Sequence, residues 1–120
     1  MTWEKNDPKD LDIFVMAVSK VNSTTCLTYY GQKNGCEEIS LDVDNTNGGL
    51  NGAETVTLLN NTINKDYVYI IAVEDYQYSI GNTNGSAFLE SWAAVRITNN
   101  VADETIGIVT TTLSSDSSKV

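Results

Sequence analysis

Short runs of alternating apolar and polar residues, broken by turn-forming residues, favour strands over helices throughout this chain. Four Asn-Gly dipeptides supply turns that tolerate positive φ. No stretch supports a helix well. The expected strands are residues 11–21, 25–30, 37–42, 54–59, 66–73, 87–98 and 105–113. The pattern predicts an all-β fold, an antiparallel β-sandwich of seven or eight strands that is Ig-like or jelly-roll-like.

The length of 120 residues, with 41% hydrophobic residues, suits one domain with its own core. Residues 1–100 form the expected sandwich, and residues 101–120 add one strand and a polar tail. The uncharged, β-branched segment 105–113 has two possible roles. It closes the sandwich as its last strand, or it pairs with the sheet edge of a neighbouring molecule.

The charge and the missing histidine exclude several classes of function. The net charge of −9 disfavours nucleic acid and anionic lipid as partners. Without histidine, Ser-His-Asp and Cys-His catalysis and imidazole zinc sites are excluded. The longest apolar run, residues 67–73, is too short to span a bilayer, so no membrane insertion is expected.

Cys26 and Cys36 are separated by nine residues, and a hairpin turning near Gly31 would place them opposite one another. We therefore predict a disulfide, with two independent buried thiols as the alternative. A disulfide indicates an oxidising, extracellular or cell-surface location. The first residues do not read as a secretory signal, so we expect a leader that has been removed or lies upstream.

Three glycosylation sequons occur, at Asn22, Asn60 and Asn84. Thirteen Asn and fourteen Thr stand beside only six Lys and one Arg, a balance unusual for a cytosolic domain. Together these features predict an extracellular glycoprotein, although a chain this rich in Asn and Thr carries one or two sequons by chance.

Two acidic segments predict a cation site. The first is Asp10-Leu11-Asp12, and the second runs from Asp42 to Asn47 and is followed by Glu54. Carboxylates two residues apart in an extended chain point to the same side, and a cation relieves their repulsion. We expect both segments to converge at one rim and to bind calcium, which takes six to eight oxygens. The expected ligands are Asp10, Asp12, Asp42 and Asp44, with Asn45, Asn47 and Glu54 as secondary candidates.

The acidic site has an alternative, since Asp42, Asp44, Asn45 and Asn47 also suit Asx turns. The segment is not an EF-hand loop. Counting from Asp42, the sixth residue is Asn47 rather than glycine, and the twelfth is Ala53 rather than glutamate.

The order of these motifs resembles the YfaP-like domain, an uncharacterised family of secreted or surface proteins. The resemblance covers residues 3 to 98 and rests on Trp3, Pro8, the DLD motif at 10–12, Tyr29-Tyr30, the LDVDNT motif at 41–46, Glu54, Tyr67 to Tyr76 and Ala94 to Ile97. Asn45 and Ala53 depart from the family pattern, where Asp and Pro are preferred. The resemblance implies a β-sandwich module of extracellular proteins without established catalytic activity.

Aromatic residues offer a second kind of site. Trp3, Trp92 and all six tyrosines are candidates for a sugar-stacking platform, and the alternative is that they pack in the core or at interfaces. Tyr29, Tyr30, Tyr76 and Tyr78 lie near expected strand ends, where a platform would sit. Carboxylate pairs also serve glycoside hydrolases, but 120 residues offer no deep cleft for such an acid. The sequence thus predicts a non-enzymatic structural or adhesive module that self-associates through sheet edges into a fibre or surface array. The alternative is a carbohydrate-binding module.

Overall fold

The computed structural model describes residues 1–3, 9–47, 52–58, 65–81, 93–99 and 102–110. Most of them are extended, which confirms the all-β prediction. The elements are β1 (Thr2–Trp3), β2 (Leu11–Ser19), β3 (Thr25–Thr28), β4 (Ile39–Val43), β5 (Gly52–Ala53), β6 (Thr55–Leu58), β7 (Tyr67–Asp75), α1 (Tyr76–Ser79), β8 (Ala94–Asn99) and β9 (Glu104–Thr110). In these described residues, no helix is long and apolar enough to cross a bilayer.

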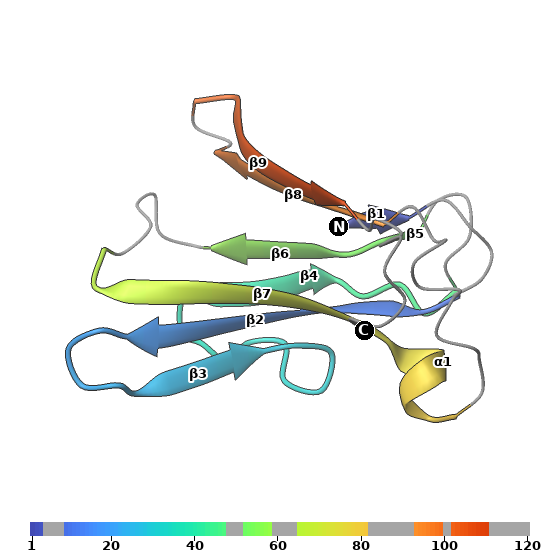
Figure 1. Cartoon of the computed structure of the whole chain (residues 1–120), viewed down its shortest axis with the longest axis horizontal. Helices are drawn as coiled ribbons and strands as arrows, with labels where there is room; N and C mark the ends of the chain where they lie inside the picture. The colour runs from blue at the N-terminus through green and yellow to red at the C-terminus, as the bar shows by residue number, and fades with distance from the viewer. Residues whose placement is uncertain (4–8, 48–51, 59–64, 82–92, 100–101, 111–120) are drawn as a thin grey trace, which may run out of the picture.

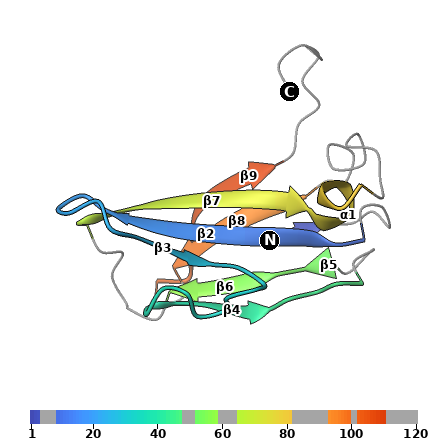
Figure 2. The same ribbon diagram turned by 90° about the horizontal axis from the view of Figure 1, so that it is seen from below.

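The strands form three open antiparallel sheets (Figure 1). The four-stranded sheet has the order β5-β1-β8-β9, the three-stranded sheet has the order β3-β2-β7, and β4 pairs with β6. Figure 2 shows β4 and β6 as a layer beside β2 and β7. The antiparallel β-sandwich of seven or eight strands therefore stays a prediction, since the described strands form three open sheets.

The antiparallel pair β2–β7 is the main structural element of the fold. All of β2 pairs with β7, from Leu11 opposite Asp75 to Ser19 opposite Tyr67. Both strands are rich in β-branched and aromatic residues, which suit a pleated sheet surface. This long ladder fixes the start of β2, and with it Asp12, against the end of β7.

The main core lies between the three-stranded sheet and the pair β4–β6. Alternate residues of β2 point into it, and β4 supplies the facing side chains. Its buried members are Ile13, Val15, Ala17, Cys36, Ile39 and Leu41. Burying an aliphatic side chain of this size contributes roughly 1.5–3 kcal/mol. A smaller cluster of Trp3, Leu11 and Ala93 joins β1 to the start of β2.

The disulfide between Cys26 and Cys36 is present, with 5.2 Å between the Cα atoms, and the chain turns at Gly31, where Tyr29 and Gln32 form an antiparallel bridge. The predicted hairpin of strands 25–30 and 37–42, however, does not form. β3 pairs with β2 and β4 pairs with β6, so the two halves of that hairpin belong to different sheets. The reason is packing, because Ile39 and Leu41 bury themselves against β2 rather than beside β3. The disulfide thus links β3 of the three-stranded sheet to the segment that precedes β4 of the two-stranded sheet.

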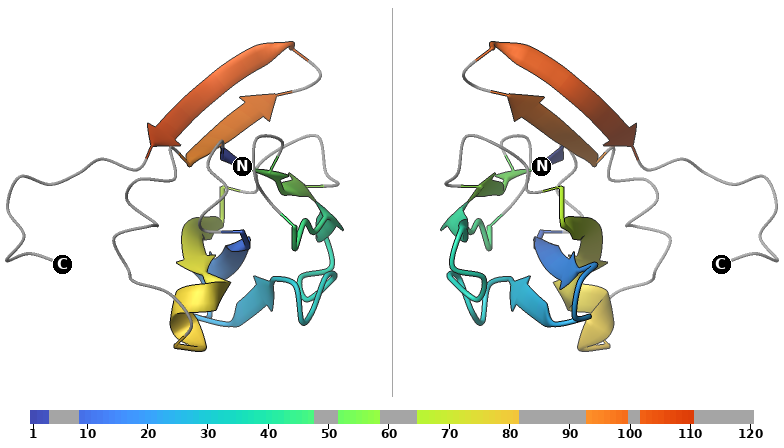
Figure 3. Two further views of the ribbon diagram at one scale, coloured as in Figure 1. Left: turned by 90° about the vertical axis from the view of Figure 1, so that its right-hand side faces the viewer. Right: turned by 90° about the vertical axis from the view of Figure 1, so that its left-hand side faces the viewer.

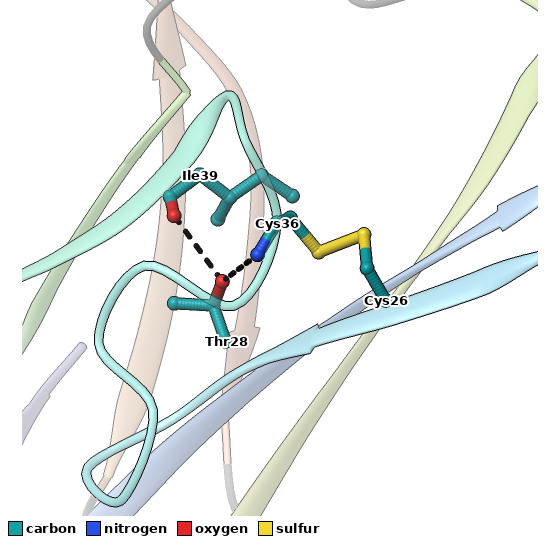
Figure 4. Close-up of a disulfide and its surroundings, with 4 residues drawn as sticks. All are labelled: Cys26, Thr28, Cys36 and Ile39. Atoms are coloured by element: carbon teal, nitrogen blue, oxygen red, sulfur yellow. Dashed lines mark hydrogen bonds between the residues drawn. A yellow bond between two sulfur atoms is a disulfide. The ribbon is translucent and has the colours of Figure 1, made fainter.

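Thr28 reinforces this connection (Figure 4). Its hydroxyl Oγ1 lies 3.2 Å from the carbonyl oxygen of Ile39, to which it donates, and 3.1 Å from the Cys36 nitrogen, which donates to it. Thr28 is fully buried, so both hydrogen bonds are sheltered from water.

The C-terminal strand pairs within the chain. β9 runs antiparallel to β8, with Val95 opposite Val109 and Arg96 opposite Ile108. The structure ends β9 at Thr110, and the rest of the predicted strand, residues 111–113, lies outside the described residues. The one-turn helix α1, which the sequence pattern did not indicate, begins after Asp75, whose Oδ1 accepts a hydrogen bond from the Tyr78 nitrogen at 3.1 Å.

Candidate metal centre

Three carboxylates from distant parts of the chain meet at one end of the molecule. Asp12 lies near the start of β2, Asp44 follows β4, and Glu54 joins β5 to β6. Figure 1 shows these three strand ends at the same end of the molecule. One oxygen from each carboxylate lies within 4.8 Å of the other two. The structure therefore brings together Asp12, Asp44 and Glu54, three of the seven predicted ligands.

Backbone contacts hold Glu54 in place. Its nitrogen donates to the carbonyl oxygen of Met1 at 2.9 Å, and the Met1 amino group donates to the Glu54 carbonyl oxygen at 2.7 Å. Just before it, Gly52 lies against the ring of Trp3, where any larger side chain would overlap the ring. The N-terminal strand thus positions the segment that carries Glu54.

The cluster is buried. The exposed fraction is 3% for Asp12 and 1% for Glu54, and Asp44 is partly buried. Among the described side chains, several carboxylate oxygens are buried without a hydrogen-bond partner. They are Asp10 Oδ1, Asp12 Oδ2, Asp44 Oδ1, Glu54 Oε1 and Asp75 Oδ2. An unpaired buried carboxylate oxygen is costly, so this arrangement calls for a positive partner.

In two of the three carboxylates, one oxygen has a hydrogen-bond or ion-pair partner and the other oxygen has none. Glu54 Oε2 accepts a hydrogen bond from the Ile13 nitrogen at 2.6 Å, whereas Oε1 has no partner. Asp44 Oδ2 lies 2.9 Å from Lys33 Nζ, whereas Oδ1 has no partner. Contacts of this kind fix the orientation of a ligand while leaving an oxygen for a metal.

Burial and like charges both make the cluster resist ionisation. Burial, and then the charges of Asp10, Asp44 and Glu74, raise the pKa of Asp12 to about 7. Burial raises the pKa of Glu54 to about 7, against the hydrogen bond from Ile13, with Asp12 and the other acids adding to the rise. Burial, followed by Asp44 and Asp75, also raises the pKa of Asp10.

The remaining predicted ligands lie differently. Asp10 is buried two residues before Asp12 and is not part of the three-carboxylate group. Asp42 is exposed and is not part of the three-carboxylate group. A bulge between Leu41 and Val43 interrupts the regular alternation there, so Asp42 and Asp44 differ in exposure. Asn45 makes an Asx turn, accepting from the Asn47 nitrogen at 3.0 Å.

Two residues at the site were missed by the sequence analysis. Asp75 lies opposite Leu11 in the β2–β7 ladder, and its Oδ2 is buried without a partner. Lys33 pairs with Asp44. The acidic pair Glu74-Asp75 directly after an apolar strand was the available signal for Asp75, whereas nothing in the sequence connects Lys33 with Asp44.

Several of the aromatic residues predicted to form the platform pack against other aromatic residues of the chain. Tyr29 stacks on Phe14 with 5.3 Å between ring centroids, and Tyr30 packs edge-on against Tyr29 and Tyr76. Trp3 is buried in the core, and Trp92 lies outside the described residues. Tyr78 is exposed.

Of the predicted glycosylation sites, Asn22 lies in an exposed turn after β2, where its Oδ1 accepts from the Thr24 hydroxyl at 2.8 Å. Asn60 and Asn84 lie outside the described residues.

No family model, curated protein or solved structure matches this chain. The resemblance to the YfaP-like domain therefore stays a prediction. The acidic cluster and the disulfide are the features from which a function has to be inferred.

Proposed function

We propose that this protein is a non-enzymatic, extracellular structural or adhesive module whose fold is stabilised by calcium. The observation that carries the proposal is the group of three carboxylates of Asp12, Asp44 and Glu54. One oxygen of each lies within 4.8 Å of the other two, and each carboxylate has a buried oxygen without a hydrogen-bond partner. A divalent cation satisfies all three at once and removes their mutual repulsion.

The spacing of the oxygens supports calcium. Calcium binds oxygens at about 2.3–2.6 Å, so two ligands on opposite sides of one ion lie roughly 5 Å apart. Oxygens that all lie within 4.8 Å of one another fit that limit. Asp10, buried two residues before Asp12, is a candidate for a further carboxylate ligand, and calcium readily completes its shell with backbone oxygens and water.

The position of the cluster supports a structural role for the ion. Asp12 belongs to the three-stranded sheet, Asp44 follows a strand of the two-stranded sheet, and Glu54 follows β5 of the four-stranded sheet. One ion would therefore tie all three sheets together at one end. Since Asp12 and Glu54 are almost wholly buried, the ion would have little surface left for a substrate.

The proposed extracellular setting is supported by the disulfide between Cys26 and Cys36 and by the exposed Asn22 sequon. Self-association through sheet edges, into a fibre or a surface array, is part of this proposal.

Thermal unfolding with calcium, with magnesium and with a chelator tests the metal. Calcium at 100 times its dissociation constant stabilises the native state by about 2.7 kcal/mol, so the chelator should lower the Tm by several degrees. Asp12→Asn should abolish most of that difference. Asp42→Asn is the matched control, because this exposed residue lies outside the three-carboxylate group, and it should keep the calcium response. A Tm that changes neither with calcium nor with chelator would overturn the proposal.

The second candidate is a carbohydrate-binding module, favoured by the aromatic cluster at the same end of β2. Among its members, the side chain of Tyr30 is 39% exposed, so part of it is open to a ligand. Binding on a glycan array that is lost in Tyr30→Ala or Tyr78→Ala would favour this candidate. Large assemblies without glycan binding would favour the structural module.

A further inference from the structure

The structure places the basic residue Lys33 against the acidic cluster. Its Nζ donates to Asp44 Oδ2 at 2.9 Å, in an ion pair whose side chains are 51% exposed for Lys33 and 15% exposed for Asp44. Asp44 is at the same time a member of the three-carboxylate group with Asp12 and Glu54. A metal ion bound by this group and the ammonium of Lys33 would therefore share one carboxylate.

The backbone holds Lys33 at this place. Its carbonyl oxygen accepts a hydrogen bond from the Leu41 nitrogen at 2.8 Å, which ties the loop of residues 29–36 to β4. Asp44 follows β4 three residues after Leu41. Figure 3 shows the loop, in teal, next to β4 and away from the β8–β9 hairpin. Lys33 is therefore kept near Asp44 by the fold as well as by the attraction of their charges.

The loop itself has little conformational freedom. The Gln32 nitrogen donates to the carbonyl oxygen of Tyr29 at 2.9 Å, and the Gly35 nitrogen donates to that of Gln32 at 3.1 Å. Gly35 passes so close to Leu27 that a Cβ there would overlap the Leu27 carbonyl oxygen, so only glycine fits. The disulfide closes the base of the loop. A loop constrained in this way keeps the ammonium of Lys33 within reach of the cluster.

We propose that Lys33 is a built-in counter-ion of the acidic cluster, which stabilises the metal-free protein and lowers its affinity for calcium. The inference rests on the calcium site of the proposed function and concerns how tightly that site binds. Without metal the ammonium attracts the carboxylates, and it repels a cation that enters among them. Both effects weaken calcium binding, because one stabilises the metal-free state and the other destabilises the bound state.

The balance of charges supports this role. When ionised, the three grouped carboxylates carry three negative charges, and Lys33 carries one positive charge. One calcium ion then makes the group neutral, which avoids the cost of an uncompensated buried charge. Without Lys33 the empty site would be more negative. Because calcium sites set their affinity through the number of charges around the ion, that site would bind calcium more tightly.

The size of the effect follows from the distance between the charges. Lys33 contacts one oxygen of the Asp44 carboxylate at 2.9 Å, and calcium binds oxygens at about 2.4 Å, so an ion on the other oxygen lies roughly 6 Å from Nζ. In water, a double and a single charge at about 6 Å repel by an energy equivalent to about tenfold in a dissociation constant. Dissolved salt screens part of this repulsion.

Calorimetric titration of calcium into the whole, oxidised chain at about 10 mM salt tests the competition. Lys33→Gln removes the charge but keeps an amide donor, and it should lower the dissociation constant about tenfold, a gain that shrinks as salt is added. Lys33→Arg keeps the charge and should bind as the wild type does. If Lys33 served only to orient Asp44, Lys33→Gln would bind calcium no more tightly than the wild type.

Lys20→Gln is the charge-matched control. Lys20 is exposed, and its Nζ donates to the carbonyl oxygen of Lys65 at 2.7 Å. It lies eight residue steps beyond Asp12 along the direction of β2, which corresponds to roughly 27 Å. At that distance the loss of one charge should change the dissociation constant by less than about twofold. An effect of the net charge alone would appear equally in both variants.

A trivalent ion gives a sharper test of the electrostatic mechanism. Lanthanum carries three charges, so the repulsion energy from Lys33 should be about one and a half times that of calcium. Lys33→Gln should therefore tighten lanthanum binding about thirtyfold, against about tenfold for calcium. A rearrangement of the ligands gives no reason for the effect to scale with the charge of the ion.

Thermal unfolding in chelator tests the metal-free state. Lys33→Gln should melt several degrees below Lys20→Gln, and this difference should shrink in saturating calcium, where the ion has replaced most of the missing positive charge. Equal Tm values of the two variants in chelator would overturn the inference. So would a Lys33→Gln variant that binds calcium no more tightly than the wild type.

Both of those outcomes leave the calcium proposal standing, provided that the wild type itself binds calcium. A wild type that binds no calcium would overturn the proposed function together with this inference. The titration of the wild type thus distinguishes the two failures.

Discussion

Glu54 and Ile13 are joined by a buried hydrogen bond, with 2.6 Å between Glu54 Oε2 and the Ile13 nitrogen. The bond crosses from the segment between β5 and β6 to β2, one residue after Asp12. It holds the Glu54 carboxylate against the acidic cluster while Oε1 stays without a partner. The chain thus fixes a carboxylate in a place where its charge is unfavourable, which is the arrangement expected of a metal ligand.

Glu54→Gln should therefore change stability in opposite directions with and without metal. The amide oxygen can still accept the hydrogen bond from Ile13, and the loss of charge relieves repulsion from Asp12 and Asp44. In chelator the variant should be at least as stable as the wild type, whereas in calcium it should fall below it. Urea unfolding under both conditions measures this. A variant destabilised equally in both would assign Glu54 a packing role only.

The metal-free protein should lose stability as the pH rises from about 4 to 7. Burial, aided by neighbouring acids, raises the pKa of Asp12 and of Glu54 to about 7 in the native state. In the unfolded chain these groups titrate near 3.9 and 4.3. Between those values the native state binds more protons, so raising the pH favours unfolding. Stability is therefore greatest below the unfolded pKa values and declines as the pH rises through the native ones.

Urea midpoints at several pH values in chelator measure this dependence. Calcium should counteract the decline, because it binds the deprotonated carboxylates. The variant Asp12→Asn combined with Glu54→Gln should flatten the chelator profile, which separates these two acids from the others. A midpoint that rises steadily with pH in chelator would contradict the assignment.

The sequence pattern predicted where the strands lie better than it predicted which strands pair. Apolar and β-branched runs and alternation located the regions of β2, β3, β4, β6, β7, β8 and β9, and the acidic motifs supplied Asp12, Asp44 and Glu54. The disulfide pairing was predicted, but its hairpin was not formed, because the partner of a strand depends on which distant apolar face needs covering. Short-range spacing carries no information about that choice.

The departures at the site have local causes. The bulge between Leu41 and Val43 separates Asp42 from Asp44, although the two were expected on one side of the strand. Asp75 approaches the cluster only because β7 pairs with β2 over its full length. Both facts depend on register, which a single sequence does not specify.

Removing the disulfide should destabilise the protein without abolishing its response to calcium. Closing a loop between Cys26 and Cys36, ten positions apart, contributes about 2.5–3 kcal/mol in the chain-entropy model. The double variant Cys26→Ala with Cys36→Ala should lose about that much in urea unfolding. Its Tm should still rise with calcium, since neither cysteine is among the grouped carboxylates. A loss of the calcium response would show that the disulfide positions the metal site.

Thr28→Val tests the hydroxyl that connects β3 to the segment before β4. The substitution keeps the shape of the side chain but leaves the Cys36 nitrogen without its acceptor and removes a donor to the Ile39 carbonyl. Leaving a buried polar group unsatisfied costs about 1–3 kcal/mol, and urea unfolding of the oxidised protein should show a loss in that range. Thr25→Val, on the same strand but exposed, is the control and should change stability by less than about 0.5 kcal/mol. Equal effects of the two substitutions would mean that Thr28 acts through its strand preference, because only Thr28 has these two sheltered hydrogen bonds to lose.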